Sequence, residues 1–211
     1  MPDRYLTISE VDGFILAGGA SSRMGIDKAH LRLGERTLVE RIAAALSAIV
    51  VRVAVVSAKP DAGAWGLPVV RDVHHGLGAM GGLHAALSAG QTAWVAIVSC
   101  DLPFVTGELF ARLMTYAGEW CDAVVPMQTD GRMQPLCALY RRTACLKVVE
   151  DLIQSGELRP SVLVRRVWTR VVTADELSDV RGATRFFINL NTPEDYSRAQ
   201  ALFNSEVIGD G

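Results

Sequence analysis

Short, mostly apolar runs alternate with segments of helical periodicity along the first 126 residues. Runs of this kind are typical of strands that are buried on both faces of a sheet. They cover residues 14–17, 50–56, 93–99 and 122–126. Apolar residues recur at helical spacing over 37–46, 83–89 and 106–114. Thr106 stands where the third helix needs an N-cap. This alternation predicts an α/β fold with a mostly parallel sheet and helices on both of its faces.

The last third of the chain is less regular. We expect strands over 133–140, 168–173 and 186–190, and helices over 145–153 and 192–202. Thr192 and Pro193 give the last helix a cap and a preferred first residue. Residues 204–211 are expected to be a frayed tail.

Length, charge and cysteine usage narrow the class of protein. A chain of 211 residues is most simply one domain. Its net charge of −2 and its lack of a long basic run argue against a nucleic-acid surface. No apolar run approaches the ~20 residues of a membrane span, and residues 1–12 lack the apolar centre of a signal peptide. The four cysteines lie far apart, which is typical of reduced thiols in a cytoplasmic protein.

The loop that follows the first apolar run carries the clearest chemical signal. The strand over 14–17 ends in Gly18-Gly19, and Arg23 and Lys28 follow within the same loop. Glycines let backbone N–H groups approach one anion, and the two cations supply the charge that a polyphosphate requires. The sequence therefore predicts a nucleotide phosphate site at this strand end.

Two better-known phosphate loops fit less well. No segment has the spacing of a Walker P-loop. Gly76-Leu-Gly78-Ala-Met-Gly81 has the letters of a dinucleotide fingerprint, but the polar stretch Arg71-Asp72-Val-His-His75 precedes it instead of a buried strand. Adjacent histidines without a third ligand at useful spacing are interpreted as loop residues rather than metal ligands.

The blocks of the chain resemble a known family. Leu16-Ala-Gly-Gly-Ala-Ser-Ser-Arg-Met-Gly-Ile-Asp-Lys28 is similar to the signature of the nucleotidyltransferases related to molybdenum cofactor guanylyltransferase. Further matching blocks follow in family order over most of the chain: Gly78–Leu87, Cys100–Pro103, Gln134–Arg142, Arg159–Ser161 and Asn189–Asp195. The resemblance implies a three-layer α/β/α sandwich with a Rossmann-like sheet. It also implies one nucleotidyltransferase domain over 1–211, with a nucleotide-binding half at about 12–125 and an acceptor-side half at about 126–203.

The resemblance implies a role for individual residues of the nucleotide half. Nucleotide contacts are expected at Leu16, Ala17, Gly18, Gly19, Lys28, Ser57, Asp72 and Asp101. Lys28 matches the phosphate-binding lysine, and Arg23 is placed to steady the departing pyrophosphate. Ser57 is a departure, because guanylyltransferases often have Asn at this position.

Asp101 is the candidate metal ligand. It follows the apolar run 93–99, and ligands gather at the carboxyl ends of strands in open α/β sheets. A carboxylate that faces a triphosphate needs a hard cation between them, and Mg²⁺ is held by one or two carboxylates plus phosphates. The family uses this aspartate for magnesium.

The acceptor side is expected at Gly82, Gln134, Asn189 and Asn191. The resemblance implies transfer of GMP from GTP to molybdopterin, with Arg23, Lys28 and Asp101 as the catalytic set and proteins that mature molybdoenzymes as recipients. A phosphate acceptor is already anionic near neutral pH, so no general base is needed. A cytidylyltransferase of the same fold stays open, because Gly78-Ala-Met-Gly-Gly82 departs from the usual base-side loop. A nucleotide-binding module without turnover is the third reading.

Overall fold

The computed structural model describes residues 6–18, 28–59, 65–72, 74 and 76–209. Its main sheet has seven strands in the order β5 (Val69–Arg71), β4 (Val53–Ser57), β1 (Val11–Leu16), β6 (Trp94–Ser99), β8 (Cys137–Arg141), β7 (Ala123–Pro126) and β9 (Thr169–Val172). Of these strands, β8 alone is antiparallel to its neighbours. The predicted mostly parallel sheet is therefore confirmed.

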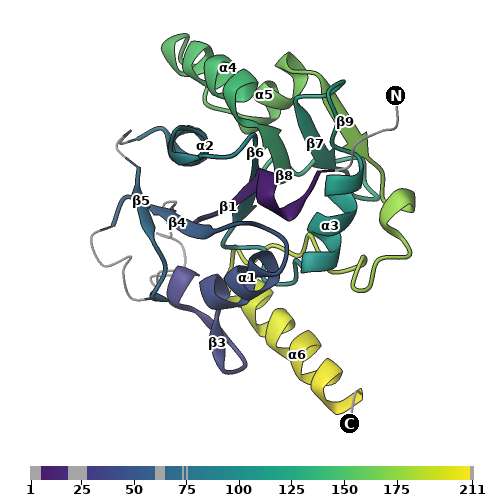
Figure 1. Ribbon diagram of the computed structural model, residues 1–211. Helices are drawn as coiled ribbons and strands as arrows, with labels where there is room; N and C mark the ends of the chain where they lie inside the picture. The colour runs from purple at the N-terminus through teal and green to yellow at the C-terminus, as the bar shows by residue number, and fades with distance from the viewer. Residues whose placement is uncertain (1–5, 19–27, 60–64, 73, 75, 210–211) are drawn as a thin grey trace.

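Helices cover both faces of this sheet, which confirms the predicted three layers (Figure 1). The helices α1 (Leu38–Ser47) and α3 (Gly107–Thr115) pack on one face. The other face is covered by α2 (Gly78–Ala89), α4 (Arg142–Gln154) and α5 (Pro160–Arg166). The last helix, α6 (Pro193–Gly209), packs against a two-stranded hairpin of β2 (Arg32–Leu33) and β3 (Arg36–Thr37). Among the described helices, none is long and apolar enough to cross a membrane.

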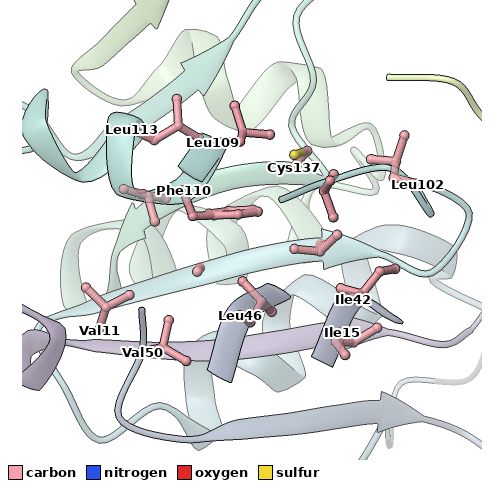
Figure 2. Close-up of a cluster of buried hydrophobic side chains, with 14 of the residues drawn as sticks. Val11, Ile15, Ile42, Leu46, Val50, Leu102, Leu109, Phe110, Leu113 and Cys137 are labelled. Atoms are coloured by element: carbon pink, nitrogen blue, oxygen red, sulfur yellow. The ribbon is translucent and has the colours of Figure 1, made fainter. Parts of the chain in front are cut away.

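The core explains why the short strands are continuous in apolar residues. On β1, Phe14 and Leu16 face the layer of α2 and α4, while Ile15 faces the layer of α1 and α3. Figure 2 shows the second of these layers, where Leu46 of α1 and Phe110 of α3 meet the sheet. Each fully buried side chain of this size contributes about 1.5–3 kcal/mol relative to exposure.

Threonine caps fix the starts of three helices, and two of these caps, Thr106 and Thr192, were predicted. Thr37 caps α1 through a reciprocal pair of hydrogen bonds with Glu40, whose N–H reaches the Thr37 hydroxyl at 3.2 Å. Thr106 accepts from the N–H of Leu109 at 3.2 Å and caps α3, as expected. The hydroxyl of Thr192 accepts from the N–H of Asp195 at 3.1 Å, which confirms the predicted cap of α6.

Three expectations were wrong. Residues 186–190 form turns and an irregular segment instead of a strand, because buried Phe186 and Leu190 anchor a loop under α3 and α6. The helix α6 continues to Gly209, so residues 204–209 are not a frayed tail. The helix α2 begins at Gly78 rather than at residue 83, so the expected glycine loop forms its first turn. Helix α5 and the hairpin were not predicted.

Candidate active site

The carboxyl ends of the parallel strands form the edge on which the predicted nucleotide residues lie. The strand β1 lies between β4 and β6, and its last residues bond to both neighbours. The N–H of Ala17 donates to the carbonyl of Val56 at 2.9 Å, and the N–H of Cys100 donates to the carbonyl of Leu16 at 3.1 Å. Leu16 and Ala17 are buried, whereas Gly18 is exposed and has open space where a Cβ would stand. The backbone at Gly18 is therefore accessible to a ligand.

The predicted phosphate lysine meets the predicted acceptor-side asparagine. Lys28 Nζ donates to Asn191 Oδ1 at 2.9 Å, across 163 positions of sequence. Asn191 is itself held by the N-terminal turn of α6, because its N–H donates to Asp195 Oδ2 at 3.1 Å. This bond is the chief reason why the pKa of Asp195 lies below its usual value. The partner of the Lys28 ammonium is thus a neutral amide, which leaves its positive charge uncompensated by that contact.

Asp101 lies beside the segment that carries Asn191. Its backbone carbonyl accepts from the N–H of Leu190 at 3.0 Å, so the turn after β6 is fixed to the segment that carries Asn189 and Asn191. The side chains of Asp101, Asn189 and Gln134 line one pocket of about 400 Å³. Three predicted residues from three distant segments are therefore brought to one cavity.

Asp72 follows strand β5, and Ser57 is the last residue of the neighbouring strand β4. The N–H of Asp72 donates to the carbonyl of Ser57 at 3.2 Å, so the two strand ends are joined. The Ser57 hydroxyl is buried and accepts from the N–H of Lys59 at 3.1 Å. Its own O–H can still donate. The Asp72 carboxylate accepts from the N–H of His74 at 3.0 Å and lies against Gly81 of α2.

Three further predicted positions need separate mention. Gly19 and Arg23 lie outside the described residues. Gly82 is buried inside α2, where a Cβ would lie 3.6 Å from the side chain of Leu16. The structure thus places Gly82 behind the strand end of β1.

Three polar residues of the pocket were not among the predicted site residues: Ser99 at the end of β6, Arg159 and Ser161. Arg159 and Ser161 line the cavity that holds Asp101, although their motif was part of the family resemblance. The Arg159 guanidinium donates to both carboxylate oxygens of Glu157, at 2.8 and 2.5 Å. This pairing lowers the pKa of Glu157 to about 2. The family motif Arg159–Ser161 was the signal that could have identified these two residues. Nothing in the sequence indicates that Arg159 pairs with Glu157.

A larger cavity, of about 990 Å³, lies between α1, α3 and the segment 181–185. It contains none of the predicted site residues, so size does not identify the site. The residues with predicted functional roles instead lie at the carboxyl ends of the strands, where ligands usually bind in open α/β sheets.

Comparison with known proteins decides the family. A family model described as the MobA-like NTP transferase domain matches residues 13–171. The chain belongs to the MobA-like NTP transferase family. It is therefore a nucleotidyltransferase, and Lys28, Asp72 and Asp101 all lie within the matched range.

Relatives of the MobA-like family match over nearly their whole length. The probable molybdenum cofactor guanylyltransferase of Pelotomaculum thermopropionicum is 32% identical over 201 residues, which cover 95% of this chain and 97% of the relative. The probable molybdenum cofactor guanylyltransferase of Chloroflexus aggregans is 38% identical over 211 residues, with 94% and 97% covered.

Solved structures give the same fold. Molybdopterin-guanine dinucleotide biosynthesis protein A from Archaeoglobus fulgidus superimposes with a TM-score of 0.78 at 25% identity, covering 92% of this chain and 99% of that one. The 2-C-methyl-D-erythritol 4-phosphate cytidylyltransferase of Thermus thermophilus has a TM-score of 0.66 at 21% identity, with 94% and 100% covered. The second likeness shows the fold alone.

Proposed function

We propose that this protein transfers GMP from GTP to molybdopterin and releases pyrophosphate. The observation that carries the proposal is the meeting of Lys28, Asp101 and the Asn189–Asn191 segment at one edge of the sheet. The names of the relatives give the substrates, since guanylyltransferases of the molybdenum cofactor match along the whole domain. We propose a single catalytic unit, with the nucleotide over the carboxyl ends of β5, β4, β1 and β6 and the acceptor in the pocket of Gln134 and Asn189.

The reaction requires one anion to attack another. An oxygen of the acceptor phosphate forms a bond to the α-phosphorus of GTP, and the bond from that phosphorus to pyrophosphate breaks. The second pKa of a phosphate monoester is about 6, so the acceptor needs no general base near pH 7. Lys28 lowers the barrier by neutralising charge on the triphosphate, and its amide partner Asn191 keeps the ammonium in place without cancelling its charge. Arg23 would add a second cation.

The donor set fits a divalent cation that is shared with substrate. Asp101 is partly exposed and offers a carboxylate, and Asn189, whose amide can supply a neutral oxygen, lines the same pocket. Among the described residues, no group of three His, Cys, Asp or Glu side chains could form a cage of its own. Mg²⁺ suits such a site, since it takes one or two carboxylates and completes its shell with phosphates and water. When bound, the cation would stabilise negative charge on the transferring phosphoryl group.

The test separates binding from turnover. Pyrophosphate release is measured with GTP, Mg²⁺ and molybdopterin, and GTP affinity is measured by titration calorimetry. Lys28→Ala should weaken GTP binding roughly 10- to 100-fold, the value of a charge-assisted hydrogen bond. Asp101→Ala should lower turnover at least about 100-fold and abolish the Mg²⁺ dependence of GTP binding. Lys147→Ala, which removes an exposed lysine of α4, serves as the matched control.

Other outcomes assign other functions. Tight binding of CTP with no response to GTP would indicate the cytidylyltransferase of this fold. Nucleotide binding without pyrophosphate release in the presence of acceptor would indicate a binding module. Near-normal turnover of Asp101→Ala would remove its metal role. We also propose that the reaction takes place in the cytoplasm and that proteins which mature molybdoenzymes receive the product. The four buried cysteines, none of which forms a disulfide, suit a reducing compartment.

A further inference from the structure

The loop that joins β5 to α2 is folded back onto the first turns of that helix. The Asp72 carboxylate accepts from the N–H of His74, and the carbonyl of His74 accepts from the N–H of Leu77 at 3.3 Å. A Cβ on Gly81 would stand 3.1 Å from both carboxylate oxygens of Asp72 and 3.2 Å from the His74 carbonyl. The loop therefore lies directly on α2, and the contacts that hold the loop on the helix also fix the position of Asp72.

A pair of histidines fastens this loop to the helix. The His74 ring meets the His84 ring edge-on, with centroids 4.5 Å apart and planes at 86°. His84 lies three positions after Gly81, so both residues lie on the same face of α2. From the adjacent helix α4, a carboxylate oxygen of Glu150 lies 3.9 Å from His84 Nε2. The half-buried His84 is thus the contact between the loop and the helical layer.

We propose that His84 is a positioning residue for nucleotide binding: its ring holds His74, and through it the loop on which Asp72 meets the nucleotide. This inference rests on the proposed function, because it takes Asp72 as a nucleotide contact. His84 itself would act indirectly, because Asp72 and not His84 would contact the nucleotide. Its loss should therefore change nucleotide affinity rather than the rate of the chemical step.

The charge state of the pair supports a neutral His84. Burial, first, and the neighbouring His74, second, lower the pKa of His84 below 6.5, while Glu150 and Asp72 oppose the shift. These are the charged groups that face the ring from the loop and from α4, and α2 has no other titratable side chain. A proton on His84 would place a positive charge in this half-buried contact between the two rings, where burial disfavours it. Protonation of His84 should therefore weaken its contact with His74, and the loop should be held less firmly on α2 as the pH falls below 6.5.

The experiment compares three variants of the full chain. Titration calorimetry gives the Kd of GTP with Mg²⁺, and steady-state pyrophosphate release gives kcat and KM, both between pH 5.5 and 8. His84→Ala should raise Kd and KM about three- to tenfold, the value of one aromatic contact, with kcat within twofold of wild type. His84→Phe keeps a ring and cannot be protonated, so it should restore the wild-type Kd at pH 7.5. Ser88→Ala, at an exposed position one turn further along α2, is the matched control.

The pH profile is the readout that a purely structural role would not change. Wild type should lose affinity for GTP between pH 7 and 5.5 more steeply than His84→Phe does. Equal pH profiles, an unchanged Kd in His84→Ala, or a loss confined to kcat would overturn the inference. If His84→Ala is unfolded, His84→Phe and His74→Ala carry the same comparison. Wild type that binds neither GTP nor CTP overturns the proposed function, whereas wild type that binds GTP without dependence on His84 overturns the inference alone.

Discussion

A buried carboxylate at the start of β1 gives the sharpest prediction about stability. Asp12 is only 1% exposed, and its two oxygens accept four hydrogen bonds. Arg52 donates at 2.9 and 3.2 Å, and the backbone N–H groups of Gln91 and Thr92 donate at 2.6 and 3.1 Å. Asp12 thus joins β1 to the segment before β4 and to the turn before β6. Asp12→Ala removes all of these acceptors at once.

The size of the effect follows from what is left unsatisfied. Each buried backbone N–H without a partner costs about 1–3 kcal/mol. Arg52 loses less, because it also donates to the carbonyl of Ala89 at 2.8 Å and its side chain is 35% exposed. Breaking a buried ion pair costs about 3–5 kcal/mol, so we expect Asp12→Ala to lower the free energy of unfolding by about 3–5 kcal/mol. Asp12→Asn keeps the shape and one acceptor oxygen, and should lower it by only about 1–2 kcal/mol.

Urea denaturation at pH 7 measures both changes, and its pH dependence provides a second test. Burial raises the pKa of Asp12, but the bonds from Arg52, Gln91 and Thr92 together bring it below 3.8. The stability that the carboxylate contributes is therefore present above pH 3.8 and is lost as the pH falls through the lower folded value. The gap between wild type and Asp12→Asn should narrow below about pH 4. A loss below about 1 kcal/mol in Asp12→Ala, or a gap that widens in acid, would refute this reasoning.

Two further predictions concern α2 and the cysteines. Gly81→Ala brings a methyl group 3.1 Å from both carboxylate oxygens of Asp72, so the Kd of GTP measured by calorimetry should rise several-fold. The control Ser88→Ala should leave this Kd unchanged. An unaltered Kd in Gly81→Ala would contradict the packing of the loop against α2. The four cysteines are buried, and burial raises the pKa of the Cys121 thiol and more strongly that of Cys137. Ellman's reagent should therefore react slowly with the native protein and rapidly with four thiols in denaturant. Rapid labelling of the native protein would argue against this burial.

The parts of the fold that could be predicted are those with a local cause. The strands β1 and β6 are buried on both faces, so residues 14–16 of β1 and 94–98 of β6 form continuous apolar runs. The direction of β8 has no such signal, because a fully buried antiparallel strand has the same composition as a parallel one. The edge strand β5 is short and Val69 is 41% exposed, so its apolar run is too weak to stand out. Residues 186–190 were wrongly predicted to be a strand, because apolar side chains can anchor a loop in the core as well as pack in a β-sheet.

The candidate site divides in the same way. Lys28 could be singled out because it lies in the glycine loop after the first apolar run and matches the family motif, and Asp101 because it comes just after the apolar run 93–99. The hydrogen bond between Lys28 and Asn191 could not, since nothing local relates positions 163 residues apart. The ring contact of His74 with His84 was missed for the same reason, although His74 had been noticed as a loop residue. Residue types were thus predictable, and their pairings depended on the sheet.

The two ends of β1 have separate tasks, and this separation has a consequence for mutational work. Asp12 lies near the amino end of the strand, in the buried network with Arg52, whereas Leu16 and Gly18 lie at the carboxyl end, where the nucleotide residues gather. Six residues of extended chain span about 20 Å, and the charge of Asp12 is paired with the guanidinium of Arg52 beside it. The charge of Asp12 should therefore contribute to stability without affecting the electrostatics of phosphate binding. Asp12→Asn, studied well below its unfolding temperature, should bind GTP as wild type does, and a change in its Kd would mean that the ends of the strand are mechanically coupled.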